Sequence, residues 1–138
     1  MSVSAPPHRG GGYAVAYDYL DRADAGLGSA RVTSDPAERF VLAHVAALRA
    51  AAAVLAVRSR PGSRRQQRNA WTLLAQMAPE LSEWASFFAA GAAKRAAAEA
   101  GRSRVVTERE ADDLVRDAEH FVHVVEEVLG LSRQQVLR

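Results

Sequence analysis

The chain has 138 residues and a formal net charge of +2, so it can form one domain with its own core, and its total charge does not identify a partner. It contains no cysteine, which excludes disulfides, a thiolate nucleophile and a cysteine-based zinc site, and fits a reducing compartment. The first residues lack the cationic start and apolar run of a signal peptide, and we find no stretch of the about 20 uncharged apolar residues that a membrane span requires. We therefore expect a soluble, cytoplasmic protein.

The charges are unevenly distributed along the chain. Residues 58–104 carry nine basic and three acidic side chains, residues 105–138 carry four basic and eight acidic ones, and residues 1–57 carry five of each. We therefore expect faces of opposite sign. Lys94 is the only lysine. This preference for arginine favours a high-GC bacterial genome as its cause, and more weakly a preference for phosphate, whose oxygens match the guanidinium fork.

The N-terminal part of the chain predicts a tail and one short helix. Residues 1–12 are rich in proline, glycine and small side chains and show no apolar pattern, so we predict a disordered tail. A short amphipathic helix is expected from Tyr13 to about Ala25, because Gly26 and Gly28 would stop it.

The next helix has a clear start signal. Asp35 is expected as the N-cap, with Pro36 at the first helical position and Glu38 three residues after the cap, and the helix should run to about Arg58. One apolar stripe at helical spacing is predicted as its buried face, and the abundant alanines predict close helix packing. The stripe consists of Val41, Val45, Leu48, Ala52 and Leu55.

Three further helices are expected. Residues 69–77 read as a helix carrying Trp71 and Leu74, and residues 79–100 as a helix closed by Gly101. Leu81, Trp84, Phe88 and Ala92 would form the buried face of the second of these helices. The last helix begins with a capping box of Thr107 and Glu110 and stops at Gly130. With no alternating β pattern, the chain predicts an all-α bundle of four to five helices over residues 13–130, followed by a C-terminal tail at 131–138.

The last helix divides into two faces. At about 100° per residue, one side is apolar and predicts the core contact: it consists of Leu114, Ala118, Phe121, Val122, Val125 and Leu129. The opposite side is polar and should face solvent unless a second subunit covers it: it consists of Asp113, Arg116, His120, His123 and Glu127. Arg116 and His123 lie seven residues apart, so both point the same way. An arginine that stabilises a phosphorane-like charge and an imidazole that moves protons suffice for RNA cleavage without a metal.

Two other interpretations of this polar face stay open. It is typical of an ordinary solvated surface with pairs such as Arg116 to His120 and Glu119 to His123. It also places His120 and His123 three residues apart, near Glu127 or Asp117, as in a metal site. An arginine would lie beside that cation, however, and no matching Glu-x-x-His occurs on another helix, so we expect no metal and no cofactor.

The remaining candidate residues are one histidine and a group of arginines. His44 flanks the apolar stripe of its helix and is expected to be a hydrogen-bonded packing residue. Arginines crowd the end of that helix and the following segment, where they either complement the helix C-terminus or form an RNA-binding, phosphate-contacting patch. They are Arg58, Arg60, Arg64, Arg65 and Arg68. No phosphate-binding loop, dinucleotide fingerprint, nucleophile elbow or HExxH motif is present, so conventional enzyme classes are unsupported.

The motif in the last helix resembles a known signature. An arginine, six residues and a histidine, with the polar Asp117 directly after the arginine, resemble the signature of the HEPN superfamily. The segments HVAALRAAAAVLA and APELSEWASFFAAGAAKRAAAEAG are similar to the actinobacterial SAV-type HEPN family, and the similarity covers roughly residues 13–130.

The resemblance implies a helical bundle that forms a homodimer through the motif-bearing face. It also implies a metal-independent endoribonuclease of RNA processing, toxin–antitoxin or defence systems, with an antitoxin or a nucleotidyltransferase as protein partner. By motif position, Arg116 would polarise the scissile phosphate, His123 would act as acid or base, Asp117 would support them and His120 would be accessory. The alternatives are a catalytically inactive HEPN module that binds nucleotide, RNA or a protein partner, and an alanine-rich interaction protein.

Overall fold

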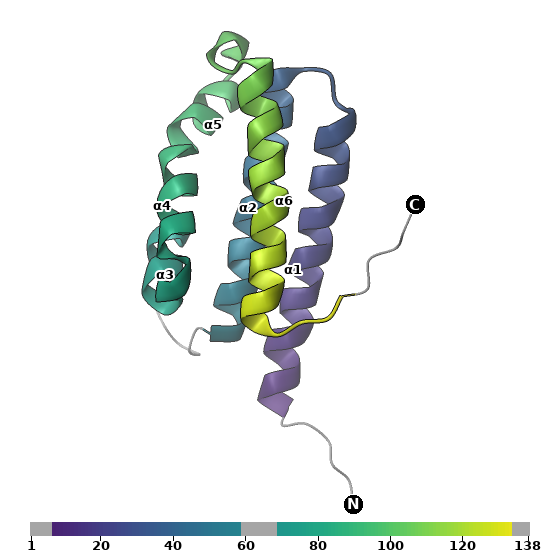
Figure 1. Cartoon of the computed structure of the whole chain (residues 1–138), viewed down its shortest axis with the longest axis vertical. Helices are drawn as coiled ribbons and strands as arrows, with labels where there is room; N and C mark the ends of the chain where they lie inside the picture. The colour runs from purple at the N-terminus through teal and green to yellow at the C-terminus, as the bar shows by residue number, and fades with distance from the viewer. Residues whose placement is uncertain (1–6, 59–68, 134–138) are drawn as a thin grey trace, which may run out of the picture.

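The computed structural model describes residues 7–58 and 69–133, which form helices joined by turns, with no strand among them (Figure 1). Three long helices, α1 (Pro7–Val32), α2 (Pro36–Arg58) and α6 (Glu108–Leu129), lie side by side. The shorter α3 (Ala70–Met77), α4 (Ser82–Ala90) and α5 (Ala92–Glu99) run along one edge of the bundle. Two 3-10 turns, η2 (Pro79–Leu81) and η3 (Ser103–Val105), complete the fold. With α4 and α5 counted as one interrupted helix the described chain has five, so the predicted all-α bundle is confirmed.

The first helix is much longer than predicted. α1 begins at Pro7, inside the expected tail, and continues through Gly26 and Gly28 to Val32, so the expected stop at these glycines is wrong. Between Ala16 and Ala30, every third or fourth residue of α1 is buried against the bundle, and this packing outweighs the roughly 1 kcal/mol that each glycine costs a helix. The buried residues are Ala16, Leu20, Ala23, Leu27 and Ala30. The part of the predicted tail at 1–6 lies outside the described residues.

The second helix begins and ends as predicted. Asp35 accepts a hydrogen bond from the backbone N–H of Ala37 and α2 runs from Pro36 to Arg58. Its most buried face, however, is not the predicted one: Val41, Val45, Leu48 and Ala52 are only partly buried. The fully buried positions are mostly alanines, because α2 packs closely against both α1 and α6 and only small side chains fit there. They include Ala43, Ala47, Ala50, Ala51, Ala53 and Val54.

The composition of α2 also corrects one expectation about membranes. An 18-residue window of α2 has a mean hydropathy of 2.1, so this helix is long and apolar enough to span a bilayer by composition alone. The same window is 56% buried inside the bundle, as expected of the core helix of a soluble protein.

The helix predicted over residues 79–100 is interrupted. Asn69 caps α3 by accepting from the backbone N–H of Trp71 at 2.7 Å, and the chain then forms η2, α4 and α5 with a break at Gly91. The carbonyl of Phe88, which in an unbroken helix would accept from the backbone N–H of residue 92, accepts from Nε2 of His44 at 2.8 Å and from the N–H of Gly91. A side chain of α2 therefore replaces a backbone donor at the break. Gly101, with φ +91°, follows the end of α5 as predicted.

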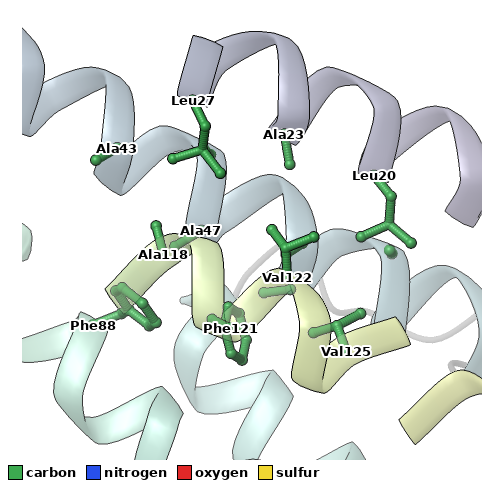
Figure 2. Packing of buried hydrophobic residues seen from close by; sticks show 14 of the residues in the cluster. Leu20, Ala23, Leu27, Ala43, Ala47, Phe88, Ala118, Phe121, Val122 and Val125 are labelled. Atoms are coloured by element: carbon green, nitrogen blue, oxygen red, sulfur yellow. The ribbon is translucent and has the colours of Figure 1, made fainter. Parts of the chain in front are cut away.

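The last helix agrees with its predicted limits. Thr107 and Glu110 form the reciprocal capping box, and Gly130, with φ +67°, adopts the left-handed conformation that ends α6. Leu20, Ala23 and Leu27 point from α1 toward α2 and α6, where they meet alanines and valines (Figure 2). On the other side of α6, Phe121 packs against Phe88 with ring centroids 5.1 Å apart, so α6 is the helix shared by both halves of the core.

Candidate functional site

The polar face of α6 is exposed, as predicted. The side chains of Arg116 and His123 are 68% and 59% exposed, whereas the six apolar residues predicted for the opposite face are all buried. This division follows from the helical period alone, because α1, α2 and α4 take up the apolar side.

Arg116 and His123 are directed away from each other. Arg116 forms an ion pair with Asp113, one turn toward the N-terminus, whereas Nδ1 of His123 lies 3.3 Å from a carboxylate oxygen of Glu126, one turn toward the C-terminus. Neither pair is the one expected from spacing. Glu119 accepts instead from Nε of Arg31 on α1 at 2.7 Å.

The carboxylate beside His123 belongs to a network that the sequence did not reveal. The other oxygen of Glu126 accepts from Arg133, which also pairs with Asp24 and, at 3.1 Å, with Asp21 of α1. Both the Glu126 and Arg133 side chains are largely buried, 13% and 10% exposed. Arg133 falls in the predicted C-terminal tail, yet it fixes Glu126 and thereby the position of His123. No sequence signal marked this network, because two of its acceptors, Asp21 and Asp24, lie more than 100 residues away from Arg133.

Two clefts lie between α4 and α6 and share Phe87 and Asp117 in their walls. The outer cleft, about 530 Å³, is lined by Pro79, Glu80, Ser82, Glu83, Trp84, Phe87 and Asp117. The second, which we call the His44 cleft, has a volume of about 410 Å³ and reaches His44 of α2. Asp117 therefore faces α4 and does not lie on the stripe of Arg116 and His123. Burial, together with the nearby Asp113, raises the pKa of the Asp117 carboxyl.

His44 is the buried packing residue that was predicted. It is 1% exposed and packs among the rings of Phe40, Trp71 and Phe88 while its Nε2 donates to the Phe88 carbonyl. Burial lowers its pKa, so the imidazole is held neutral. His120, by contrast, is exposed and meets the ring of Trp84 edge-on at 5.1 Å.

Comparison with known proteins agrees with this architecture. Residues 30–126 match the model of the SAV-type HEPN domain family. The matched residues make up more than half of the chain and include Arg116 and His123. The chain belongs to the SAV-type HEPN family. Searches of curated proteins and of solved structures found no match. The matched region begins near the end of α1, inside the broader similarity predicted from the sequence.

The arginine patch predicted in this HEPN domain is only partly described. Arg58 forms an ion pair with Glu80 at 2.7 Å and donates to the carbonyl of Met77, so it joins the end of α2 to the α3–α4 connection. Arg60, Arg64, Arg65 and Arg68 lie outside the described residues. An RNA-binding role for these arginines stays a prediction.

A metal site is not formed within the described part of the HEPN domain. No group of three or more histidine, aspartate or glutamate side chains is placed to hold an ion there. What α6 does provide is a guanidinium and an imidazole, both exposed and each positioned by a carboxylate. This pair can bind an anion and exchange a proton without a metal.

Proposed function

We propose that this HEPN protein is a metal-independent endoribonuclease whose reacting groups are Arg116 and His123. The observation that carries the proposal is their exposure on one face of α6, away from a core that needs neither of them. Arg116 and His123 contribute nothing to the packing of the bundle. We therefore infer that they act on a molecule that binds to this face of α6.

In the proposed reaction, His123 removes the proton of a ribose 2′-hydroxyl and the oxygen attacks the adjacent phosphorus. The bond to the 5′-oxygen breaks, and that oxygen takes up a proton from solvent water. Arg116 stabilises the charge on the phosphoryl oxygens. Glu126, 3.3 Å from Nδ1 of His123, favours a proton on that nitrogen and leaves Nε2 free for the substrate. Asp117 as a supporting group and His120 as an accessory group remain predictions of the family motif.

Two subunits are part of the proposal. Arg116 and His123 of one chain are about 10 Å apart along the helix axis at 1.5 Å per residue, and their carboxylate partners hold them in opposite directions. Both groups must come within about 3 Å of the same reacting unit. A two-fold axis near His120, midway between them, would cross two antiparallel α6 helices and bring Arg116 of one protomer opposite His123 of its partner.

The test is a cleavage assay on total RNA in EDTA with the wild type, Arg116→Ala and His123→Ala. We expect His123→Ala to lose about 10²–10⁴-fold in rate and Arg116→Ala about 10²–10³-fold, at unchanged helicity. Because each substitution removes a different group, an equimolar mixture of the two inactive variants should recover activity in mixed dimers if the site is shared between subunits.

Arg109→Ala is the matched control. Arg109 is exposed on the same stripe of α6, seven residues before Arg116, so its loss removes the same charge from the same face. Activity should change little in this variant. RNA cleavage that survives both Arg116→Ala and His123→Ala would contradict the proposal.

A second candidate function is a catalytically inactive HEPN module that binds nucleotide, RNA or a protein partner. It is favoured by the ion pair of Arg116 with Asp113, which already compensates the guanidinium. For RNA as the ligand, it predicts no cleavage by the wild type, and an RNA affinity that falls steeply with salt and decreases in Arg64→Ala plus Arg65→Ala. An antitoxin or nucleotidyltransferase partner would be sought by co-purification with the products of neighbouring genes.

A further inference from the structure

The His44 cleft has the composition of a small-molecule site. It opens where α4 breaks into α5, and its volume of about 410 Å³ lies in the range of ligand pockets. Its apolar walls come from three helices and the break itself: Phe40 of α2, Phe87, Phe88 and Ala90 of α4, Gly91, and Leu114 of α6. Phe87 is an exposed aromatic residue, and the core of the bundle does not account for it.

One ring nitrogen of His44 has no hydrogen-bond partner among the described residues. Because Nε2 donates to the Phe88 carbonyl, the neutral ring carries its proton there, and Nδ1 is an acceptor. Nδ1 is buried and has no hydrogen-bond partner among the described residues. A buried acceptor without a donor is costly, so His44 is a strained point in the wall of the cleft.

The charged groups of the cleft favour a donor. Glu110 is paired with Lys94 at 2.7 Å and Asp113 is paired with Arg116, but Asp117 forms no ion pair within the described chain. The raised pKa of Asp117 shows that its ionised form is disfavoured where it stands. A cation placed beside it would relieve both the burial and the repulsion from Asp113.

We propose that the His44 cleft binds a small organic ammonium ion with an aromatic or branched apolar body. The ammonium group pairs with Asp117, and the body lies between Phe87 and Leu114. His44 contributes the apolar edge of its ring to the wall of the cleft near Gly91. Asp117 has no ion pair within the described chain, whereas the Lys94 ammonium at the cleft is already paired with Glu110, so a cation is favoured over an anion such as phosphate. The cleft shares Asp113 and Asp117 with the surroundings of Arg116, but ligand binding there does not require RNA cleavage.

The test is a titration of the ¹⁵N-labelled full chain, followed by amide chemical shifts. Three probes of nearly equal size separate charge from shape: 2-phenylethylamine, 2-phenylethanol and phenylacetate. We expect the amine to bind about tenfold more tightly than the alcohol, phenylacetate not to bind, and the shifts to centre on Phe87, Gly91 and Asp117. n-Butylamine, which mimics a lysine side chain, should bind more weakly than 2-phenylethylamine because it lacks the aromatic body.

Variants then assign the groups. Asp117→Asn should bind the amine and the alcohol equally, and Gly91→Leu, whose Cβ would stand in ordinary contact with the His44 ring at 3.5 Å, should weaken both. Glu127→Gln removes an exposed carboxylate of α6 outside the cleft and should change nothing. Equal binding of amine and alcohol by the wild type, or an amine preference that persists in Asp117→Asn, would overturn the proposal. So would n-butylamine binding as tightly as 2-phenylethylamine, which would point to a protein side chain as the occupant.

Discussion

The two sides of α6 are packed by opposite means. Toward α1 and α2 the contacts are made mainly by alanines and valines, so the three long helices approach closely (Figure 2). Toward α4 the contacts are made by rings: Phe121 meets Trp84 and Phe88 at centroid distances of 5.3 and 5.1 Å. Large rings keep α4 farther from α6 than alanines would, and both clefts open on that side. The small-residue half is closely packed, and the aromatic half contains the clefts.

Removal of a buried ring from the aromatic side should reduce the stability of the fold the most. Phe88 is fully buried and contacts Trp71, Trp84 and Phe121, so Phe88→Ala should lower the free energy of unfolding by about 3–5 kcal/mol. Urea denaturation measures this loss. Phe87→Ala removes the same ring one residue earlier, at an exposed position, and should cost far less. Equal losses would mean that the aromatic cluster does not hold α4 in place.

The small-residue half should instead be destabilised by a larger side chain, because no space is left between its helices. Ala47 of α2 is fully buried near α1 and α6, so Ala47→Leu should destabilise the fold by about 1–3 kcal/mol. Ala89→Leu makes the same change at an exposed position of α4 and should be nearly neutral. Thermal unfolding followed by circular dichroism compares the two. If Ala47→Leu is also neutral, the close packing of the three long helices is not what limits side-chain size there.

The helix ends and the two faces of α6 were predictable, because they depend on local chemistry. The cap at Asp35, the capping box of Thr107 and Glu110, and the glycine at 130 act within one turn of chain. The exposure of Arg116 and His123 follows from the helical period.

What the sequence did not predict depends on contacts between helices. α1 continues through Gly26 because α2 and α6 cover its buried side, and the stripe of α2 shifts to alanine because that helix is enclosed. The break at Gly91 depends on a hydrogen bond from His44, 44 residues away along the chain from Phe88. In the candidate site, the motif gave Arg116 and His123, but Glu126 and its partner Arg133 required the fold to place α1 beside the end of α6.

The pH dependence of stability should show whether the aromatic half also contains a titrating group. Burial lowers the pKa of His44, with smaller contributions from Arg95, which also lowers it, and from the Phe88 carbonyl and Glu99, which raise it. The unfolded chain therefore binds a proton near pH 6.5 that the folded chain binds only at lower pH. Stability is fully present above pH 6.5 and is lost as the pH falls, by up to about 1.4 kcal/mol between pH 7.5 and 5.5.

His44→Gln isolates this contribution, because glutamine can still donate to the Phe88 carbonyl but does not titrate. The variant should be less stable than the wild type at pH 7.5, since it loses ring contacts with Phe40, Trp71 and Phe88. Its stability should nevertheless fall less between pH 7.5 and 5.5, as measured by urea denaturation at each pH. Ala89→Leu, which changes an exposed residue and no titrating group, is the control and should keep the wild-type dependence. If His44→Gln keeps it too, the acid-sensitive group lies outside the aromatic half, and the contrast between the two sides of α6 is one of packing alone.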